Sequence, residues 1–405
     1  MCIRQFILRS RRIYRATLAH AVGAGMFALA SCLVPAQTAT VRDSVGIKIV
    51  SNSARSAAPV AFKLADKPLI RVGGLESDPD LEFDFKSGYM QAIRLSNGGL
   101  VVSDKVRLQF FDANSKRVKI LGRFGSGPQE FQIAGIMCVT RGDTLVVQDA
   151  PNGRLAIVDA RAMQFVRTIP TMEFGSLPPR GCLGDGTFLL SKQFGPKSVV
   201  EHLYRFRVDG KLVNDYGEFP SPKFEILAPA FLHLNAFGNQ FVLASTLSND
   251  LLFYAPNGKL SSVVRSSDPI LPMTGANLLR LAERFEASMR AINPNLPAKQ
   301  FDGKAQVYVQ QSALKTVPGH YEVIADGAGG IWVQDYRETK MWVAPWTYFN
   351  ADGKIVGRLI VPSAPDDPYG ARVLGFGPNE IIIKTFDADG ASYLSVYPLV
   401  RVTAK

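Results

Sequence analysis

Histidine is scarce in this sequence. Only four histidines occur among 405 residues, and three of them, His202, His233 and His320, lie beyond the N-terminal segment. No His-x-His or His-Glu-x-x-His pair is present, although closely spaced histidines are typical of catalytic zinc sites. The sequence therefore argues against a zinc enzyme and predicts no metal site built on histidine.

A long apolar run is also missing. Residues 16–30 form an Ala/Gly-rich stretch that is too short to span a membrane comfortably. A basic segment without acidic residues precedes it, and this order is typical of an export signal. Residues 1–36 are therefore predicted to be a signal peptide. Its basic residues are Arg4, Arg9, Arg11, Arg12 and Arg15.

Two cleavage sites are compatible with this signal. Leu29-Ala30-Ser31-Cys32 resembles a bacterial lipobox, in which Cys32 would be acylated and become the first mature residue. Residues 34–36 instead offer small side chains to ordinary signal peptidase, and Arg11-Arg12 leaves the twin-arginine route open. In either case we expect an exported bacterial protein, located in the periplasm, lipid-anchored in the cell envelope, or extracellular.

Acidic residues are outnumbered by basic ones. The 46 Lys and Arg against 35 Asp and Glu give a net charge of +11, and loss of the five signal-peptide arginines lowers it to +6. So small an excess on an exported chain is weak evidence for nucleic-acid binding. We expect no nucleic-acid partner, and contact with a membrane only through an N-terminal lipid.

Glycine and proline are frequent, at 35 and 25 residues, and separate many short apolar strands. The middle residues of these strands are 45, 43, 53, 90 and 50 residues apart. Steps of about 40–50 residues match the four-stranded blade of a β-propeller, and the longest step holds one blade plus an insertion. The apolar strands are 100–102, 145–147, 188–190, 241–243, 331–333 and 381–383.

This repeat predicts an all-β fold, a six-bladed β-propeller of four-stranded blades over residues 67–400, after an N-terminal strand and linker at 37–66. Hairpins with the sequence Asp-Gly-Lys or Asn-Gly-Lys recur at 209–211, 257–259 and 352–354, where we expect type I′ turns. The last unit is one strand short. Residues 68–73 resemble an outer strand, so we expect them to complete that blade and close the ring.

Residues 266–316 interrupt the repeat between the fourth and fifth blades. Their apolar residues fall at helical spacing, with Thr274 as a suitable N-cap and Pro294 beyond the end. We expect an amphipathic helix packed on a face of the propeller, the alternative being a helix that binds a partner. The residues at this spacing are Leu278, Leu281, Ala282, Phe285, Met289 and Ile292.

The crossover between the first two blades carries the most distinctive motif, Gly122-x-x-Gly125-x-Gly127-Pro128-x-Glu130-Phe131. Together with the strands at 143–149 and 154–159, it resembles an NHL-type repeat. The chain is similar to exported bacterial six-bladed β-propeller proteins with NHL-like blades, over about residues 67–400. The resemblance implies the fold. It implies no reaction, because that group is largely without assigned function.

Strand order places the ends of the second strands, the crossovers and the insertion on one face, the expected ligand face. Asp104, Asp149 and Asp335 hold equivalent positions there. They could form a carboxylate ring that holds Ca²⁺ or acts in acid–base chemistry, or each could accept backbone hydrogen bonds in its own turn. No other cofactor and no catalytic residue is predicted.

Basic residues on the same face could receive an acidic glycan or a peptide carboxylate, or could simply be solvated. These basic residues are Lys105, Arg107, Arg154, Lys192, Arg337 and Lys384. His233 lies in an inner strand, where it could face the central channel. The candidate ligand-binding residues are thus Asp104, Arg107, Asp149, Arg154, Lys192, His233, Asp335 and Arg337.

Cys138 and Cys182 precede the middle residues of their apolar strands by 8 and 7 residues. This places them in the inner strands of adjacent blades. They could form a disulfide if their Cα atoms lie within about 7 Å, and buried free thiols are the alternative.

These features favour an exported binding module that recognises an unidentified protein, peptide or glycan on the face carrying the second-strand ends. Two alternatives stay open. One is a metal-assisted hydrolase or lyase of the lactonase-like propeller type, and the other is a structural scaffold in an envelope assembly.

Overall fold

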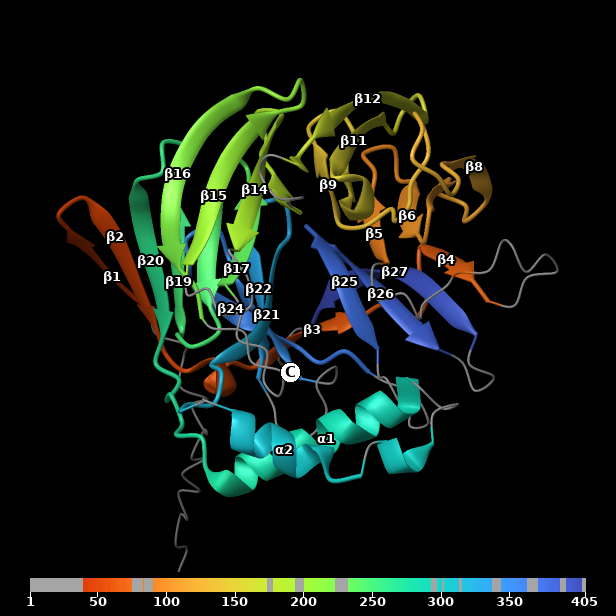
Figure 1. The fold of residues 1–405 in the computed structure, drawn as a ribbon. Helices are drawn as coiled ribbons and strands as arrows, with labels where there is room; N and C mark the ends of the chain where they lie inside the picture. The colour runs from red at the N-terminus through yellow and green to blue at the C-terminus, as the bar shows by residue number, and fades with distance from the viewer. Residues whose placement is uncertain are drawn as a thin grey trace, which may run out of the picture. The chain divides into compact units, whose positions relative to one another are not determined.

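The computed structural model shows a mostly β protein and describes most of the chain from residue 39 onward (Figure 1). The described ranges are 39–74, 83, 90–172, 178–193, 200–222, 232–292, 297–300, 302–312, 315–336, 344–362, 371–386 and 391–402. Cys32, Pro294 and Arg337 lie outside them. No helix in these ranges is long and apolar enough to cross a membrane.

Sets of four antiparallel strands recur along the chain, and within each set consecutive strands are hydrogen-bonded neighbours. The first three sets are β5 (Gln91–Arg94), β6 (Leu100–Asp104), β7 (Arg107–Phe111) and β8 (Arg117–Leu121); β9 (Met137–Thr140), β10 (Thr144–Asp149), β11 (Arg154–Asp159) and β12 (Gln164–Pro170); and β13 (Pro179–Cys182), β14 (Thr187–Gln193), β15 (Val200–Arg207) and β16 (Leu212–Pro220). Two more are β17 (Leu232–Phe237), β18 (Gln240–Ser245), β19 (Asp250–Tyr254) and β20 (Leu260–Ser266); and β21 (His320–Ala325), β22 (Ile331–Asp335), β23 (Trp346–Phe349) and β24 (Ile355–Leu359). The last run comprises β25 (Arg372–Gly377), β26 (Glu380–Phe386) and β27 (Ser392–Arg401).

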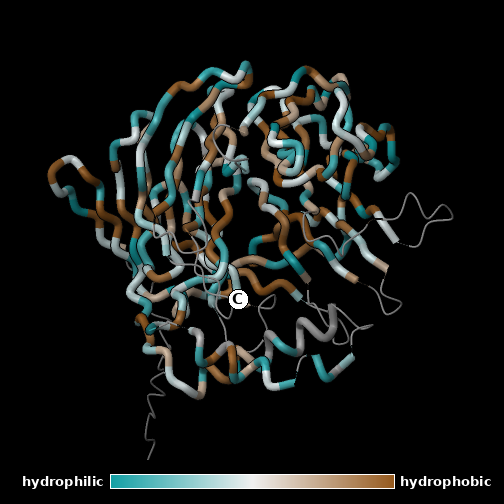
Figure 2. The backbone as a smooth tube through the Cα atoms, in the orientation of Figure 1, coloured by the Kyte–Doolittle hydropathy of each residue, from teal (hydrophilic) through white to brown (hydrophobic). Residues whose placement is uncertain are grey.

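The second strand of each set is deeply buried. In β6, for example, Leu100, Val101 and Val102 are all 0% exposed. The apolar runs expected from the sequence form these second strands, β6, β10, β14, β18, β22 and β26. Figure 2 shows apolar and polar stretches mixed through the strands of the molecule. A strand covered on both faces needs apolar residues at successive positions, which explains continuous runs in place of alternation.

The first strands of successive sets contact one another. β5 contacts β9, β9 contacts β13, β13 contacts β17, β17 contacts β21, β21 contacts β25, and β25 contacts β5. Such cyclic contact between the first strands of successive antiparallel sheets is the arrangement of a propeller-like fold. We refer to β5, β9, β13, β17, β21 and β25 as the inner strands.

The N-terminal segment joins several sheets. β1 (Ala39–Ser44) and β2 (Ile47–Asn52) form a hairpin whose second strand pairs in parallel with β20. β3 (Val60–Leu64) pairs with both β24 and β27, and β4 (Ile70–Gly73) pairs antiparallel with β27. The expected pairing of residues 68–73 with the last sheet is therefore confirmed. The linker expected within residues 37–66 is wrong in part, because that range also contains β3, which pairs with backbone groups of β24 and β27.

The repeated hairpin turns differ from the expected type. Gly210, Gly258 and Gly353 have φ of 90°, 81° and 79°, but the residues before them do not have positive φ. Each glycine N–H donates to the carbonyl three residues earlier, as from Gly210 to Arg207 at 2.9 Å, and the strand register shifts beside each turn. These are features of a type I turn followed by a glycine bulge, so the type I′ prediction is wrong.

Two helices lie between β20 and β21 in the chain. α1 (Gly275–Ile292) starts after Thr274, whose Oγ1 accepts a hydrogen bond from the Asn277 N–H at 3.2 Å, as expected for an N-cap. Leu281 and Ala282 of α1 are buried with Ala305 of α2 (Lys304–Gln311), and Tyr336, just after β22, packs against them. The helix α2 was not expected from the sequence. Its contact with Tyr336 places the pair near a second-strand end.

Candidate functional site

The crossover between β8 and β9 lies beside the ends of two second strands. The N–H of Ala134 donates to the carbonyl of Lys105, just after β6, at 2.6 Å. The N–H of Gly135 donates to the carbonyl of Gln148 in β10 at 2.8 Å. The crossover therefore lies on the face expected from strand order.

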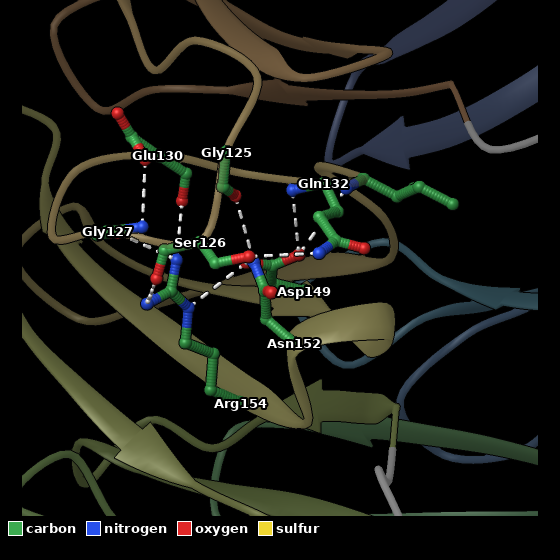
Figure 3. A network of polar contacts seen from close by, with 9 residues as sticks. Gly125, Ser126, Gly127, Glu130, Gln132, Asp149, Asn152 and Arg154 are labelled. Carbon is green, nitrogen blue, oxygen red and sulfur yellow. Dashed lines mark hydrogen bonds and ion pairs between the residues drawn. The ribbon is translucent and has the colours of Figure 1, made fainter.

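Asp149 ties this crossover to the end of β10 (Figure 3). Its Oδ1 accepts hydrogen bonds from the backbone N–H groups of Gln132 and Ile133 at 3.1 and 3.3 Å. Its Oδ2 accepts from Asn152 Nδ2 at 2.7 Å and from Arg154 Nε at 3.0 Å. The carboxylate is fully buried, and backbone N–H groups and an arginine balance its charge.

Arg154 uses the rest of its guanidinium group on the Gly-rich motif. Nη1 donates to the carbonyl of Ser126 at 3.1 Å, and Nη2 donates to the carbonyls of Gly127 and Glu130 at 3.0 and 2.7 Å (Figure 3). The Glu130 carboxylate accepts from the Gly127 N–H at 2.8 Å, a bond that lowers the pKa of Glu130. These hydrogen bonds fix the conformation of the crossover and attach it to β11 through Arg154.

The other two equivalent aspartates are also paired with arginines. Asp104, which is buried, accepts from Arg107 Nη2 at 3.0 Å and from Gln109 Nε2 at 3.0 Å. Asp335 accepts from Arg358 Nη2 at 2.7 Å and lies 3.5 Å from Arg55 Nε. Burial raises the pKa of Asp335, and the two arginines oppose that effect.

Arg55 was not expected near this face. It lies in the N-terminal segment, is 4% exposed, and also forms an ion pair with Asp268 at 3.2 Å. Its Nη2 donates to Asn249 Oδ1 at 3.2 Å and to the carbonyl of Gly319. The N-terminal segment thus joins the end of β22 to both ends of the segment that contains the helices.

Of the two arrangements that the sequence left open, a carboxylate ring and separately bonded aspartates, the contacts favour the second. Asp104, Asp149 and Asp335 each have an arginine partner. In the part of the chain that the structure describes, no group of three or more His, Cys, Asp or Glu side chains could hold a metal ion. Lys192 is half-buried near the end of β14, with His202 opposite it in β15.

Contacts between inner strands connect the sheets near the centre. Cys138 of β9 and Cys182 of β13 form a disulfide with Cα atoms 5.6 Å apart. In the next pair of inner strands, an added Cβ at Gly181 would lie 2.7 Å from the Cβ of Ala236, so glycine permits close approach. Asn235 then donates from Nδ2 of β17 to the carbonyl of Val323 in β21 at 2.8 Å.

Polar side chains gather where the inner strands begin, beside the second-strand ends. Register places Gln91, His233, Glu322 and Arg372 opposite Ser103, Ala244, Gln334 and Lys384, each at the same position relative to its buried apolar run. Arg180 of β13 lies within the corresponding stretch. We call Arg180, His233, His320, Glu322 and Arg372 the inner-strand cluster.

The two histidines of the cluster lie side by side. Their ring centroids are 5.6 Å apart, and His233 Nε2 lies 3.0 Å from the carbonyl oxygen of Tyr321. Burial lowers the pKa of His233 to about 4, and the positive charge of Arg180 adds to the shift. Burial likewise lowers the pKa of His320 well below its usual value, with His233 and Arg55 adding to the effect. Both imidazoles are therefore neutral at pH 7.

His320 is 1% exposed, and neither of its ring nitrogens has a hydrogen bond of good geometry among the described residues, although the backbone of Ser248 and of Ala244 lies near enough to oppose the lowering of its pKa. Desolvation raises the pKa of Glu322 to about 7, and the charge of Arg372 opposes that shift. Glu322 is only half-buried, so water can reach it. Because buried polar groups are almost always paired, His320 is the member of the cluster that requires an explanation.

Of this cluster, only His233 was among the candidate residues from the sequence. A usable signal was present. Gln91, Arg180, His233, Glu322 and Arg372 each precede the middle of an apolar second strand by nine or ten residues. A polar residue that recurs at that offset indicates a shared ring position.

No protein-family model matches the chain, and no curated protein is significantly similar in sequence. Among solved structures, the chain is similar to a protein of Bacteroides fragilis described as exported, with 12% identity and a TM-score of 0.51 over 88% of this chain and 100% of that one. At this identity the likeness shows the fold alone.

Two further solved structures are similar at lower scores. A DUF4221 family member from Bacteroides vulgatus has 11% identity and a TM-score of 0.44, covering 84% of this chain and 99% of that one. A streptogramin B lyase has 12% identity and a TM-score of 0.41, covering 82% and 97%. Scores this low do not establish a shared function.

Proposed function

We propose that this chain is an exported six-bladed β-propeller that works as a binding module, with its ligand site on the face where the second strands end. The blade number is supported by the sets of four strands in the described ranges, with β4 as the fourth strand of the last set. It is further supported by the cyclic contact of the inner strands.

Export is supported by the basic and apolar order of the first 36 residues. A disulfide between Cys138 and Cys182 adds to this, because such bonds persist in oxidising compartments. Lipid attachment at Cys32 and the NHL-like character of the blades stay predictions. The mass of the mature N-terminus would distinguish lipidation from ordinary cleavage.

The observation that carries the binding function is the inner-strand cluster. Its side chains come from four inner strands and lie at the end of those strands that adjoins the second-strand ends. The cluster contains His320, whose buried ring nitrogens have no hydrogen bond of good geometry in the described ranges, and the half-buried Glu322, whose pKa is raised to about 7. A bound ligand would satisfy such groups, and a purely structural role would favour apolar side chains there.

The experiment is a binding screen of the mature protein against glycans, peptides and small metabolites, repeated with Glu322→Ala. Lys211→Ala is the matched control, because Lys211 is exposed at a hairpin turn at the opposite end of the strands. Binding lost in Glu322→Ala and kept in Lys211→Ala supports the proposal. Equal binding by both folded variants contradicts it, and a wild type that binds nothing favours a scaffold.

Acid–base catalysis by the same cluster is the second candidate. The environment moves the pKa of Glu322 to about 7 and that of His233 to about 4, so a carboxylic acid and a neutral imidazole coexist at neutral pH. Groups whose environments push their pKa values apart in this way often serve as acid and base. The metal-assisted version has less support, because each equivalent aspartate is paired with an arginine. Calcium binding there stays a prediction.

A further inference from the structure

A small cavity lies between the second and third sets of strands. Its volume is about 210 Å³, and its walls come from the end of β12, from β14 and β15, and from the hairpin turn that follows β15. The floor is apolar, because Phe188, Leu190 and Phe206 form it and are 0%, 1% and 4% exposed. Thr168 and Pro170 are exposed at the rim, so the cavity opens to solvent there.

Between the first and second sets of strands, an aromatic side chain of the chain itself fills the equivalent position. Phe131 is 0% exposed and belongs to one buried cluster with Leu145, Val147 and Val158 of β10 and β11. The residues at the same register positions of β14 and β15 form the floor of the cavity. The described part of the chain therefore leaves open, between the second and third sets, a space of the kind that a phenyl ring fills between the first and second.

Two polar residues of the lining set the polarity of a ligand. Thr171, just after β12, is 2% exposed, and its N–H donates to the carbonyl of Gly153 at 2.8 Å, whereas its hydroxyl makes no hydrogen bond to another described residue. Asp209 is already neutralised, because Arg207 Nη2 lies 2.9 Å from its Oδ2 and the Lys211 N–H donates to its Oδ1 at 3.1 Å. The described lining thus offers a hydroxyl for hydrogen bonding and no unbalanced charge.

We propose that this cavity binds a small neutral molecule with an aromatic ring and one polar group, the ring on the apolar floor and the polar group at Thr171. The site is separate from the inner-strand cluster and does not rest on the binding function proposed above. An apolar cavity of about 150 Å³ is large enough to bind benzene, so the larger volume here accepts a ring with a substituent. Phe188 and Phe206, with ring centroids 6.1 Å apart, offer aromatic contacts. An ionised ligand would lose hydration without gaining a counterion.

The test measures binding of phenol and toluene to the mature protein by calorimetry and by the rise in Tm, with benzoate and benzylammonium as charged probes. We expect both neutral compounds to bind, and each charged one to bind at least tenfold more weakly. Thr171→Val keeps the shape of the side chain and removes the hydroxyl, so it should weaken phenol binding about fivefold and should not weaken toluene binding. Leu190→Phe narrows the cavity and should weaken both. Thr40→Val, on the exposed strand β1, is the matched control and should alter neither.

Phe174 is the occupant that the chain itself could supply. Glu173-Phe174 repeats the Glu130-Phe131 pair of the previous crossover, and Phe174 lies outside the described ranges. If phenol and toluene bind only after Phe174→Ala, that side chain occupies the cavity and the inference is wrong.

The inference is also overturned if neither compound binds the wild type, or if both bind a folded Leu190→Phe variant as tightly as the wild type. Phenol binding weakened no more by Thr171→Val than by Thr40→Val contradicts the role of the hydroxyl. Benzoate or benzylammonium binding as tightly as phenol contradicts a neutral ligand.

Discussion

Replacing both Cys138 and Cys182 with alanine tests how the inner strands are held together. The disulfide links β9 to β13 and closes a loop whose ends are 44 residues apart in sequence. Both cysteines pack against a cluster of buried side chains that includes Val146, Leu155 and Phe188. Removing the bond leaves these apolar contacts largely in place, so the main expected effect is on the unfolded chain.

The stability lost with the disulfide can be estimated from the entropy of closing the loop. In the chain-entropy model, a cross-link over a loop of this length stabilises the folded state by about 4 kcal/mol at 25 °C, most of it through the lost freedom of the unfolded chain. Unfolding entropy of roughly 2 cal/mol/K per residue converts this into a fall in Tm of about 5 °C for a domain of this size.

The assay is thermal unfolding of the wild type and of Cys138→Ala/Cys182→Ala, each with and without a phosphine reductant. Reductant should lower the Tm of the wild type by about the same amount as the double substitution and should leave the variant unchanged. The reasoning is refuted if maleimide labels both thiols of the unfolded wild type without reductant. It is also refuted if the bond is present and its removal shifts unfolding by less than about 1 kcal/mol.

Three further predictions concern the inner-strand cluster, the contact between two inner strands, and the buried Asp149–Arg154 pair. Glu322→Gln should change the pH dependence of stability, because the folded-state pKa of about 7 exceeds the ordinary 4.5. The wild type should lose about 3 kcal/mol relative to this variant as pH rises from 4 to 8 in a denaturant titration, and a constant difference would contradict this. Gly181→Ala should lower the free energy of unfolding by about 1 to 3 kcal/mol, because the added Cβ would clash with Ala236. Asp149→Ala should lower the free energy of unfolding by about 3 to 5 kcal/mol, because it leaves Arg154 without its buried partner.

Matched controls are available for these three variants. Glu283→Gln alters an exposed carboxyl group of α1 and should show no comparable pH effect. Gly275→Ala lies at the start of α1, where an added Cβ meets nothing, so stability should be unchanged or slightly higher. Asp352→Ala removes an exposed carboxylate and should change stability by less than about 1 kcal/mol. If the control variants change stability, or its pH dependence, as much as the tested variants do, the named contacts are not the cause of the change.

Local features were the ones predictable from the sequence. The buried second strands and the Thr274 N-cap depend on residues within a few positions of each other, and all are present. Turn type was harder, since an Asp-Gly pair suits both a type I′ turn and a type I turn with a glycine bulge. The strand β3 was missed because it pairs with distant edges and carries no strong pattern of its own.

In the candidate site too, the features set by nearby residues were predictable and those set by distant contacts were not. Sequence position marked Asp104, Asp149 and Asp335 as equivalent, but it did not reveal their arginine partners. The partners of Asp104 and Asp149 lie within a few residues, whereas Asp335 pairs with Arg358, 23 residues away, and lies near Arg55, far away in the chain. Arg180, Glu322 and Arg372 became candidates only once the register of three different sheets was known.

By itself the sequence determined the β architecture, the turn positions and the pairing of the N-terminal stretch with the last sheet. Hydrophobic pattern and backbone preference act over short distances, which is why they can be read along a single chain. Only the tertiary structure decided which charges are paired and which polar side chains lie together where the inner strands begin. That outcome depends on contacts such as the one between His233 and Tyr321, 88 residues apart, which no local pattern specifies.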